Sequence, residues 1–405
     1  MSWFGFIWDA SMALIAAFVV LRIAFICVCA LLDRLRRGDG SPHPIAMGHQ
    51  PQPVTIVIPM YNESMAIQAT LQSILNTKYP TLEILVIDDG STDGCGALVS
   101  EFSKQHANIQ LITQRPNQGK PAALNQGFKS ATNEIVITID ADTQLKPDAL
   151  LHMVHAMQHT DISAVACNLH ISNIENWITR WQSLEYIAAL SLDRRAQHVW
   201  GTITTVPGAA SAWRKETVLS LGGFSGDTLT EDADMSLTLL RHGYRIQYLP
   251  TAHAYTLAPA TLGSLLAQRR RWIYGNIQCI RKHIGLVWDG SPLALKILGG
   301  PNFLFSHLLS FGLFALTVAY IPRATQWMEF RPFIGLVLSI LLTDLCICAL
   351  AIWIDRGPIR LLFDAPVQRL GLPTFLFGTF ITVWVSVLRR SPIQWKMIRR
   401  PKFRT

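Results

Sequence analysis

Two aspartates, Asp140 and Asp142, directly follow the β-branched run at residues 134–139. Residues i and i+2 of an extended segment point to one side, so these two carboxylates can share a divalent cation and a ribose or diphosphate. Mg²⁺ and Mn²⁺ prefer such oxygen ligands and neutralise the charge that develops on a departing phosphate. The alternative is a pair of solvated loop acids, and the position after a strand favours a ligand site.

A second acidic pair, Glu231 and Asp232, comes directly after Thr230. Threonine is a common helix N-cap, and acids in the first turn suit the helix dipole, which accounts for Thr230. A carboxylate at this place can also take the proton from an acceptor hydroxyl that attacks an anomeric carbon. The two interpretations are compatible, and Asp232 is the candidate general base.

A basic and aromatic motif, Gln268-Arg269-Arg270-Arg271-Trp272, follows further along the chain. Clustered arginines suit a diphosphate, and an indole ring offers a stacking surface for a sugar. Arginines near apolar segments also bind lipid phosphates, and for this segment alone that alternative is equally good. The acidic motifs upstream favour the diphosphate.

A third acidic group, Asp88-Asp89, ends another apolar run and leads into a flexible turn. One of these acids can face a ligand, while Asp93 caps the following helix. Acids after strands are common turn formers, so this group supports a site only together with the other motifs.

Short β-branched runs alternate with helical patterns through this part of the chain. The runs cover residues 54–58, 83–87, 109–112 and 134–139, and helical spacing covers residues 63–75, 94–105 and 121–129. This alternation predicts an α/β fold of βαβ units around a buried sheet. Such sheets bind ligands outside the carboxyl ends of their strands, where the charged motifs lie.

Long apolar runs flank the predicted sheet domain. The first, at residues 10–32, is long enough to cross a bilayer, and the arginines that follow it predict a cytoplasmic end. Later runs cover residues 303–321, 333–354 and 374–388. We therefore expect a membrane anchor (1–37), a cytosolic catalytic domain (50–258), interfacial helices with the basic and aromatic motif (259–300), C-terminal transmembrane helices (301–390) and a basic tail (391–405).

Two stretches that mix apolar, aromatic and basic residues, 173–197 and 262–283, predict amphipathic helices in the membrane interface. The side chains concerned include Trp177, Trp181, Tyr186, Arg195 and Arg269. The alternative is that both helices pack on the domain core. Arg22 and Asp344 lie inside apolar runs, where charges are costly, and we expect them to face the interior as partners. Snorkelling of Arg22 and protonation of Asp344 is the alternative.

The composition agrees with a mixed membrane and globular chain. Of the 405 residues, 50% are hydrophobic and 15% charged, and the net charge is +8. Most of the basic excess lies in the tail, which predicts contact with anionic membrane lipids and no nucleic-acid binding. The seven cysteines are scattered without metal-binding spacing, which argues against a thiolate metal site or a disulfide framework.

Together these motifs resemble those of the processive family-2 glycosyltransferases, which include cellulose, chitin, hyaluronan and poly-N-acetylglucosamine synthases. The resemblance spans about residues 54–272 and rests on five ordered motifs. They are Val57-Ile58-Pro59-Met60-Tyr61-Asn62-Glu63 with Ile87-Asp88-Asp89-Gly90-Ser91-Thr92-Asp93, Asn117-Gln118-Gly119-Lys120, Asp140-Ala141-Asp142, Thr230-Glu231-Asp232, and Gln268, Arg271 and Trp272 in a Gln-x-x-Arg-Trp signature.

The resemblance implies a GT-A fold, with a mixed and mostly parallel sheet and helices on both faces, set between transmembrane helices. It implies a multi-pass protein of the plasma (inner) membrane whose catalytic domain is cytosolic. Roles carried over by motif are donor nucleotide-sugar binding by Pro59, Tyr61, Glu63, Asp89, Lys120 and Asp140, a Mg²⁺ or Mn²⁺ ligand at Asp142, catalysis by Asp232 with Glu231, and diphosphate and acceptor binding by Gln268, Arg271 and Trp272.

The expected reaction is inverting transfer from a UDP-sugar to a growing β-linked polysaccharide, with coupling to export. The short membrane part and the stretch from Leu229 to Ser236 are most similar to poly-β-1,6-N-acetylglucosamine synthases, which favours N-acetylglucosamine. The alternatives are another polymer, or one sugar added to a lipid acceptor as in ceramide glucosyltransferases. A non-catalytic membrane scaffold would leave three motifs to coincidence. A small membrane partner subunit is a further expectation from the resemblance.

Overall fold

The computed structural model describes residues 3–37, 52–77, 79–309, 311–312, 315, 318, 330–389 and 391. Its centre is an eight-stranded sheet with the order β3-β2-β1-β4-β7-β6-β8-β5. The strands are β1 (Val54–Met60), β2 (Leu82–Asp88), β3 (Ile109–Thr113), β4 (Ile135–Ile139), β5 (Thr143–Leu145), β6 (Ile162–Ile171), β7 (Ala210–Arg214) and β8 (Arg245–Thr256).

The first half of the sheet is parallel, as the alternation of strand and helix patterns predicts. β1 pairs in parallel with β2 and β4, and β2 pairs in parallel with β3. The connecting helices are α2 (Ile67–Leu75), α3 (Cys95–Gln105) and α4 (Lys120–Ser130). The carboxyl ends of β1, β2 and β4 therefore lie at one edge, next to the start of α4.

The second half makes the sheet mixed. β7 lies antiparallel between β4 and β6, β8 is parallel to β6, and β5 is antiparallel to β8. The helices of this half are α5 (Ala149–Met157), α8 (Lys215–Ser220) and α9 (Glu231–Arg241). Hydrophobic clusters cover both faces of the sheet, one including α2, α3 and α5 and the other including α4, α8 and α9. The prediction of a mixed sheet with helices on both faces is confirmed.

Close approach of α4 to the sheet depends on one glycine. A Cβ atom on Gly127 would lie 2.3 Å from Val57 Cγ1, a distance that side-chain atoms do not tolerate. Glycine lets the helix backbone reach β1, because nothing projects from its Cα. The first residue of α4, Lys120, is thereby held against the sheet edge.

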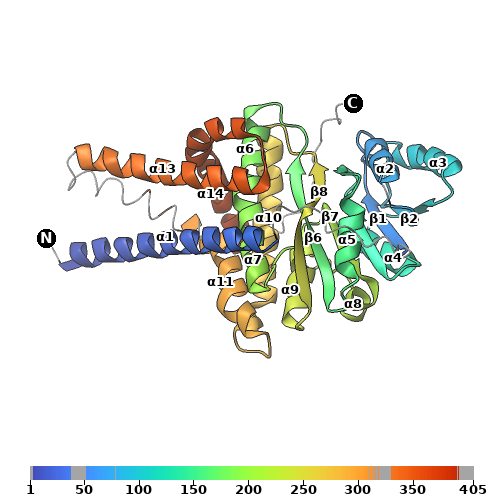
Figure 1. Cartoon of the computed structure of the whole chain (residues 1–405), viewed down its shortest axis with the longest axis horizontal. Coiled ribbons are helices and arrows are strands. Elements are labelled where there is room, and N and C mark those ends of the chain that lie inside the picture. The colour runs from blue at the N-terminus through green and yellow to red at the C-terminus, as the bar shows by residue number, and fades with distance from the viewer. Residues whose placement is uncertain are drawn as a thin grey trace.

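A column of helices stands beside the sheet, between it and the apolar helices of the chain ends (Figure 1). It comprises α6 (Trp177–Glu185), the π-helix η1 (Tyr186–Ser191), α7 (Leu192–Trp200) and α10 (Leu262–Lys282). The terminal regions add α1 (Trp3–Arg37), α11 (Gly300–Leu304), α13 (Phe330–Asp355) and α14 (Ala365–Leu388), with short helical turns η2 (Ile284–Val287), η3 (Leu295–Gly299), η4 (Phe305–Leu309) and η5 (Ile359–Asp364). In Figure 1, α1 and α13 project away from the sheet on the side opposite α3.

The described residues contain two helical segments that are long and apolar enough to cross a membrane, Leu14–Arg37 and Gly371–Leu388. Part of the predicted run at 303–321 lies outside the described residues, as do residues 392–405 of the basic tail. Large apolar side chains such as Leu14, Leu21 and Val28 are exposed on α1. Both segments match parts of the predicted runs.

Several side chains expected in a membrane interface are instead buried. Trp181 and Arg269 are each 6% exposed, Tyr186 is 7% exposed and Arg195 is 4% exposed. Ion pairs made inside the protein neutralise the two arginines, so the helix column packs on the domain, and the expectation is wrong for these four residues. Exposed apolar side chains follow α10 instead, at Ile284, Val287, Trp288, Leu293 and Ile297.

Arg22 and Asp344 face protein, but they are not partners. Arg22 donates from Nη2 to Asn302 Oδ1 at 2.6 Å and to Ser306 Oγ at 2.9 Å. Asp344 Oδ1 lies 3.5 Å from Arg369 Nε, on the neighbouring α14. The predicted pairing is wrong because α1 packs along α7 and reaches α11, while α13 packs against α14.

A buried arginine joins the ends of α1 and α13. Arg195 Nη1 lies 3.2 Å from Asp33 Oδ2, and Arg195 Nη2 lies 3.7 Å from Asp355 Oδ1. Asp355 also accepts hydrogen bonds from Asn168 Nδ2 at 2.7 Å and Ser191 Oγ at 3.1 Å. The apolar helices are thus anchored to β6 and to the helix column by polar contacts.

Candidate active site

The loop that leads into α4 is held by Asp89, at the carboxyl end of β2. The Asp89 carboxylate accepts hydrogen bonds from the backbone N–H groups of Gln118 and Gly119, each at 2.7 Å, and Gln114 Nε2 donates to it at 2.6 Å. Asp89 is 3% exposed. Both of its carboxylate oxygens therefore hold the loop that presents Lys120, and its contact with a nucleotide stays a prediction.

Lys120 links two motifs that are far apart in the sequence. Its Nζ lies 2.7 Å from Asp140 Oδ1 and 3.1 Å from Glu231 Oε1. Burial lowers the pKa of Lys120, but the carboxylates of Asp140 and Glu231 outweigh it and the net shift is upward. Lys120 is therefore a permanent cation between the two acidic motifs, at the edge where ligands bind such sheets.

Asp232 lies beside this group at the start of α9. The N–H of Gly208 donates to its Oδ2 at 3.0 Å, and the N–H of Ala233 donates to its Oδ1 at 2.9 Å. Burial raises the pKa of the Asp232 carboxyl and the charge of Glu231 raises it further, while Lys120 opposes both. A carboxylate with a raised pKa is a better proton acceptor, as a general base requires.

Gly208 is a site residue that sequence reasoning missed. A Cβ atom here would lie 3.1 Å from Lys120 Nζ and 3.3 Å from Asp232 Oδ2. The only signal for it in the sequence is the dipeptide Pro207-Gly208, which is typical of any turn. Gly208 matters because the segment that leads into β7 packs closely against Asp232, at the start of α9.

Thr230 is the N-cap position of α9, as predicted, but its side chain makes no capping hydrogen bond. The hydroxyl instead lies 3.4 Å from Cys279 Sγ on α10. A Cβ atom on Gly275 of α10 would lie 2.8 Å from two Thr230 side-chain atoms. The capping interpretation of this side chain is wrong, because α10 packs against the residue and takes up its hydroxyl.

Asp140 and Asp142 stand in a tight turn between β4 and β5. The N–H of Thr143 donates to the carbonyl of Asp140 at 3.0 Å, and the N–H of Asp140 donates to the carbonyl of Ala209 at 2.9 Å. Asp142 is 1% exposed, whereas the side chain of Asp140 is 25% exposed. The turn therefore places one carboxylate at the surface of the site and the other beneath it.

The donor set fits a hard divalent cation. Among the described residues no group of three or more His, Cys, Asp or Glu side chains could hold a metal by itself. Mg²⁺ typically keeps several waters and is bound by one or two carboxylates together with substrate phosphates. Asp140 and Asp142 can supply those carboxylates, with a nucleotide diphosphate completing the shell.

The residues predicted from the first motif lie at the end of β1. Pro59 is in the strand, opposite Ile87 of β2, while Tyr61 and Glu63 are partly exposed in the loop that follows. They share the sheet edge with Asp89, which is the arrangement expected for a nucleotide pocket. Direct roles for these three side chains remain predictions.

The motif on α10 divides into inward and outward residues. Gln268 is 6% exposed, and its Oε1 has no hydrogen-bond partner among the described residues. Arg271 is partly exposed and forms no ion pair with any residue that the structure describes. An inward amide oxygen and an available guanidinium suit ligand binding.

Arg269, within the same motif, is structural. Its Nη1 and Nη2 lie 2.9 Å and 2.6 Å from the two carboxylate oxygens of Glu185 on α6. Its guanidinium carbon also lies 4.4 Å from the centre of the Trp272 ring. This bidentate pair ties α10 to α6 and orients the indole, so the three consecutive arginines do not act as one diphosphate cluster.

Tyr186, at the start of η1, belongs to the same hydrophobic cluster as Ala141 of the acidic turn. Burial raises the pKa of its hydroxyl. The charge of Arg269 lowers this pKa, and the charge of Asp140 raises it. Trp272 packs against the same hydrophobic cluster that contains Ala141 of the acidic turn. The motif on α10 and the acids at the sheet edge therefore face a common region.

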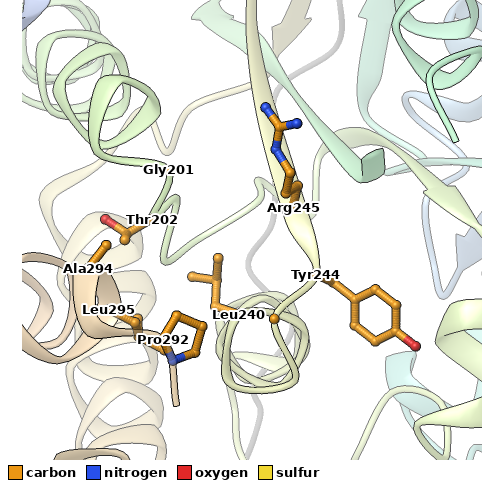
Figure 2. Close-up of a pocket in the computed structure, with 9 residues that line it drawn as sticks. Gly201, Thr202, Leu240, Tyr244, Arg245, Pro292, Ala294 and Leu295 are labelled. Atoms are coloured by element: carbon orange, nitrogen blue, oxygen red, sulfur yellow. The ribbon is translucent and has the colours of Figure 1, made fainter. Parts of the chain in front are cut away.

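A cavity of about 180 Å³ opens elsewhere, at the far end of α9 from Asp232. Leu240, Tyr244, Arg245 and Leu295 are among the residues that line it (Figure 2). None of the predicted site residues lines this cavity, so it is separate from the candidate active site.

Comparison with known proteins gives a family match and relatives. Residues 55–221 match the family model described as Glycosyl transferase family 2. The chain is 33% identical over 250 residues to the poly-beta-1,6-N-acetyl-D-glucosamine synthase of Staphylococcus epidermidis, covering 62% of this chain and 60% of that protein. It is 35% identical over 224 residues to the synthase of the same name from Staphylococcus aureus strain COL, covering 55% and 54%.

The chain thus spans about 60% of the length of the first of these relatives. Among solved structures, the mannosyltransferase of Pyrobaculum calidifontis in complex with GDP-Man and Mn²⁺ is similar with a TM-score of 0.62 and 22% identity. The similarity covers 92% of this chain and 98% of that one. At this identity the likeness shows the fold, and it agrees with the predicted GT-A architecture.

Proposed function

Residues 55–221 are a family-2 glycosyltransferase domain, and we propose that the chain transfers a sugar from a nucleotide diphosphate donor to a growing β-linked polysaccharide. The match confirms that the motifs are those of glycosyltransferase family 2. The observation that carries the proposal is the convergence of Lys120, Asp140, Glu231 and Asp232 at the carboxyl edge of the sheet.

The chemical step uses Asp232 as general base. An acceptor hydroxyl gives its proton to the Asp232 carboxylate while its oxygen bonds to the anomeric carbon of the donor. The bond between that carbon and the diphosphate breaks, and the diphosphate leaves with the electron pair. Because the hydroxyl attacks opposite the leaving group, the configuration inverts, and an α-linked donor gives a β-linked product.

The departing diphosphate carries growing negative charge. A Mg²⁺ or Mn²⁺ ion, when bound, would neutralise part of it, and Asp142 with Asp140 would hold that ion. Lys120 and Arg271 would supply further positive charge from the protein itself. Trp272 offers an aromatic face for the acceptor sugar, and Gln268 offers an inward amide.

We favour N-acetylglucosamine from a UDP-sugar as the donor unit, supported by relatives named as poly-N-acetylglucosamine synthases. A second candidate is transfer of a single sugar to a lipid, or use of a GDP-sugar. The GDP-sugar donor is suggested by the mannosyltransferase neighbour, which is similar over 92% of this chain and was solved with GDP-Man. Hyaluronan-, chitin- and cellulose-type products are further outcomes of the same test.

We also propose that the chain is a multi-pass protein of the plasma (inner) membrane with a cytosolic catalytic domain. The two candidate spans and the exposed apolar side chains of α1 support membrane insertion. The arginines at the end of α1 support a cytosolic side for the sheet. Coupling to export and a small membrane partner subunit belong to the same proposal.

The test is purified full-length protein in lipid vesicles with Mn²⁺ or Mg²⁺, given UDP-N-acetylglucosamine, UDP-glucose or GDP-mannose separately. Nucleotide release and product size are followed, and a long product separates polymer synthesis from transfer to lipid. Asp232→Asn should lower turnover by about 10²–10⁴-fold while nucleotide binding is retained. Glu101→Gln, an exposed carboxylate on α3, is the matched control. Absence of transfer from every donor in either metal would refute the proposal.

A further inference from the structure

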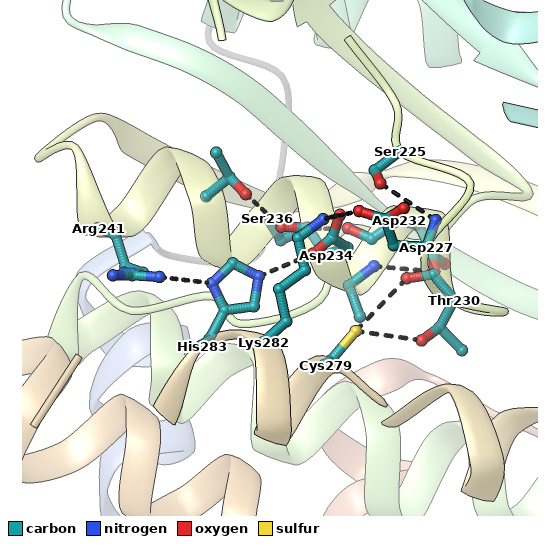
Figure 3. Close-up of polar contacts among 12 residues, drawn as sticks. Ser225, Asp227, Thr230, Asp232, Asp234, Ser236, Arg241, Cys279, Lys282 and His283 are labelled. Atoms are coloured by element: carbon teal, nitrogen blue, oxygen red, sulfur yellow. Dashed lines mark hydrogen bonds and ion pairs between the residues drawn. The ribbon is translucent and has the colours of Figure 1, made fainter. Parts of the chain in front are cut away.

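Behind Asp232, a buried polar cluster joins α9 to the end of α10 (Figure 3). Asp234 is its centre, and it is 3% exposed. Residues two apart on a helix point about 200° from one another, so Asp234 faces α10 while Asp232 faces Gly208 and Lys120. The first turn of α9 is therefore held from two sides.

Asp234 binds two side chains at the end of α10. Its Oδ1 lies 2.8 Å from His283 Nε2, and its Oδ2 lies 2.9 Å from Lys282 Nζ. His283 is 3% exposed, so its contact is inside the protein, whereas Lys282 reaches the surface and also lies 3.3 Å from Asp227. The histidine is the buried half of this attachment.

The other ring nitrogen of His283 defines its tautomer. His283 Nδ1 lies 3.2 Å from Arg241 Nη1, in the last turn of α9. A guanidinium can only donate, so Nδ1 accepts and Nε2 carries the proton that is donated to Asp234. One imidazole ring thus contacts the first and the last turn of α9 at once.

The residues just before α9 are attached to the same half of α10. The N–H of Leu229 donates to Gln278 Oε1 at 3.0 Å, and Thr230 lies against Gly275 and Cys279. Gln268, Arg271 and Trp272 occupy the other half of this one helix. Any tilt of α9 against α10 would therefore move Asp232 relative to those three side chains.

We propose that Asp234 and His283 are positioning residues for sugar transfer, holding Asp232 at a fixed place relative to the diphosphate- and acceptor-binding residues of α10. The inference rests on the proposed function. Asp234 and His283 are not among the site residues that the family motifs assign. A base displaced by about 1 Å can cost on the order of a hundredfold in rate, because proton removal and attack must occur in one geometry. The donor-side residues at the ends of β1, β2 and β4 lie on elements other than α9 and α10, so we expect donor binding to be retained when this contact is lost.

This distinction gives the test. His283→Leu removes both hydrogen bonds, His283→Gln keeps a side-chain N–H for Asp234, and Asp227→Asn removes the exposed partner of Lys282 as the matched control. Each full-length variant is assayed in vesicles for donor KM, for kcat of transfer, and for sugar transferred per nucleotide released. Amide hydrogen exchange of residues 231–236 is measured on the same samples.

For His283→Leu we expect kcat of transfer to fall by about 10- to 100-fold with donor KM nearly unchanged. Less sugar should be transferred per nucleotide released, since water can replace a misaligned acceptor, and exchange at the start of α9 should be faster. His283→Gln should restore most of the lost transfer, and Asp227→Asn should behave as the parent protein.

Unchanged coupling between transfer and nucleotide release, with activity falling only as the folded fraction falls, would overturn the positioning role. If the parent protein transfers no sugar, the proposed function fails, and exchange at residues 231–236 still tests the pair. In that case, unchanged amide hydrogen exchange at residues 231–236 in His283→Leu would overturn the positioning role. If that variant does not fold, loss of coupling in Asp234→Asn but not in His283→Gln supports the role, and equal behaviour of the two refutes it.

Discussion

Lys120 Nζ lies 2.7 Å from Asp140 Oδ1, which brings the first residue of α4 into an ion pair with the turn that follows β4. The same ammonium group reaches Glu231 at 3.1 Å and so connects three separate motifs. In this group, the charge of Glu231 raises the pKa of the Asp232 carboxyl and the charge of Lys120 lowers it.

The raised pKa of Asp232 leads to a prediction about pH. Transfer requires the ionised carboxylate, so the rate should increase with pH through a pKa above the usual value for an aspartate. The charge of Glu231 raises the pKa of Asp232. Glu231→Gln should therefore move the acidic limb of the kcat profile to lower pH, measured across pH 4 to about 8 with saturating donor. A limb that moves upward would contradict the arrangement.

Gly208→Ala should slow transfer without unfolding the domain. The added Cβ would lie 3.1 Å from Lys120 Nζ and 3.3 Å from Asp232 Oδ2, so one of the two side chains must shift. We expect kcat to fall by about tenfold or more. Gly226→Ala, where nothing lies within 4 Å of the added atom, is the control. Equal turnover of the two variants would show that this close approach is unimportant.

Gly275→Ala tests the contact between α9 and α10 through stability. Its Cβ would lie 2.8 Å from Thr230, forcing the helices apart at an overpacking cost of about 1–3 kcal/mol. Gly263→Ala in the same helix has open space and should be neutral or slightly stabilising. Thermal unfolding in one detergent compares them, and similar midpoints for the two variants would count against the contact.

Arg195→Met should weaken the attachment of α1 and α13. Asp33 and Asp355 would each lose a buried cationic partner, a change that typically costs about 3–5 kcal/mol. Arg245→Met, which breaks an ion pair whose arginine side chain is 72% exposed, should cost less than about 1 kcal/mol. Denaturant unfolding separates the two, and a small loss in both would show that the buried arginine is dispensable.

Local patterns were sufficient to predict much of this chain. Alternating β-branched runs and helical spacing predicted the parallel half of the sheet, because strand and helix periods depend on neighbouring residues. Placement of acids after strands predicted the sheet edge at which Asp89 and Asp140 lie, because parallel strands end on one side. The helix boundaries differ by a few residues, as at α2, which begins at Ile67.

Only the tertiary structure decided which charged side chains form ion pairs. It also decided which glycines allow two elements to pack closely. Arg269 resembles its two neighbours in sequence, yet it binds Glu185, and Arg22 contacts Asn302 while Asp344 contacts Arg369. Gly208 and Gly275 likewise have no distinguishing sequence context. These relationships join segments far apart in the chain, and they depend on how helices pack, which no local periodicity encodes.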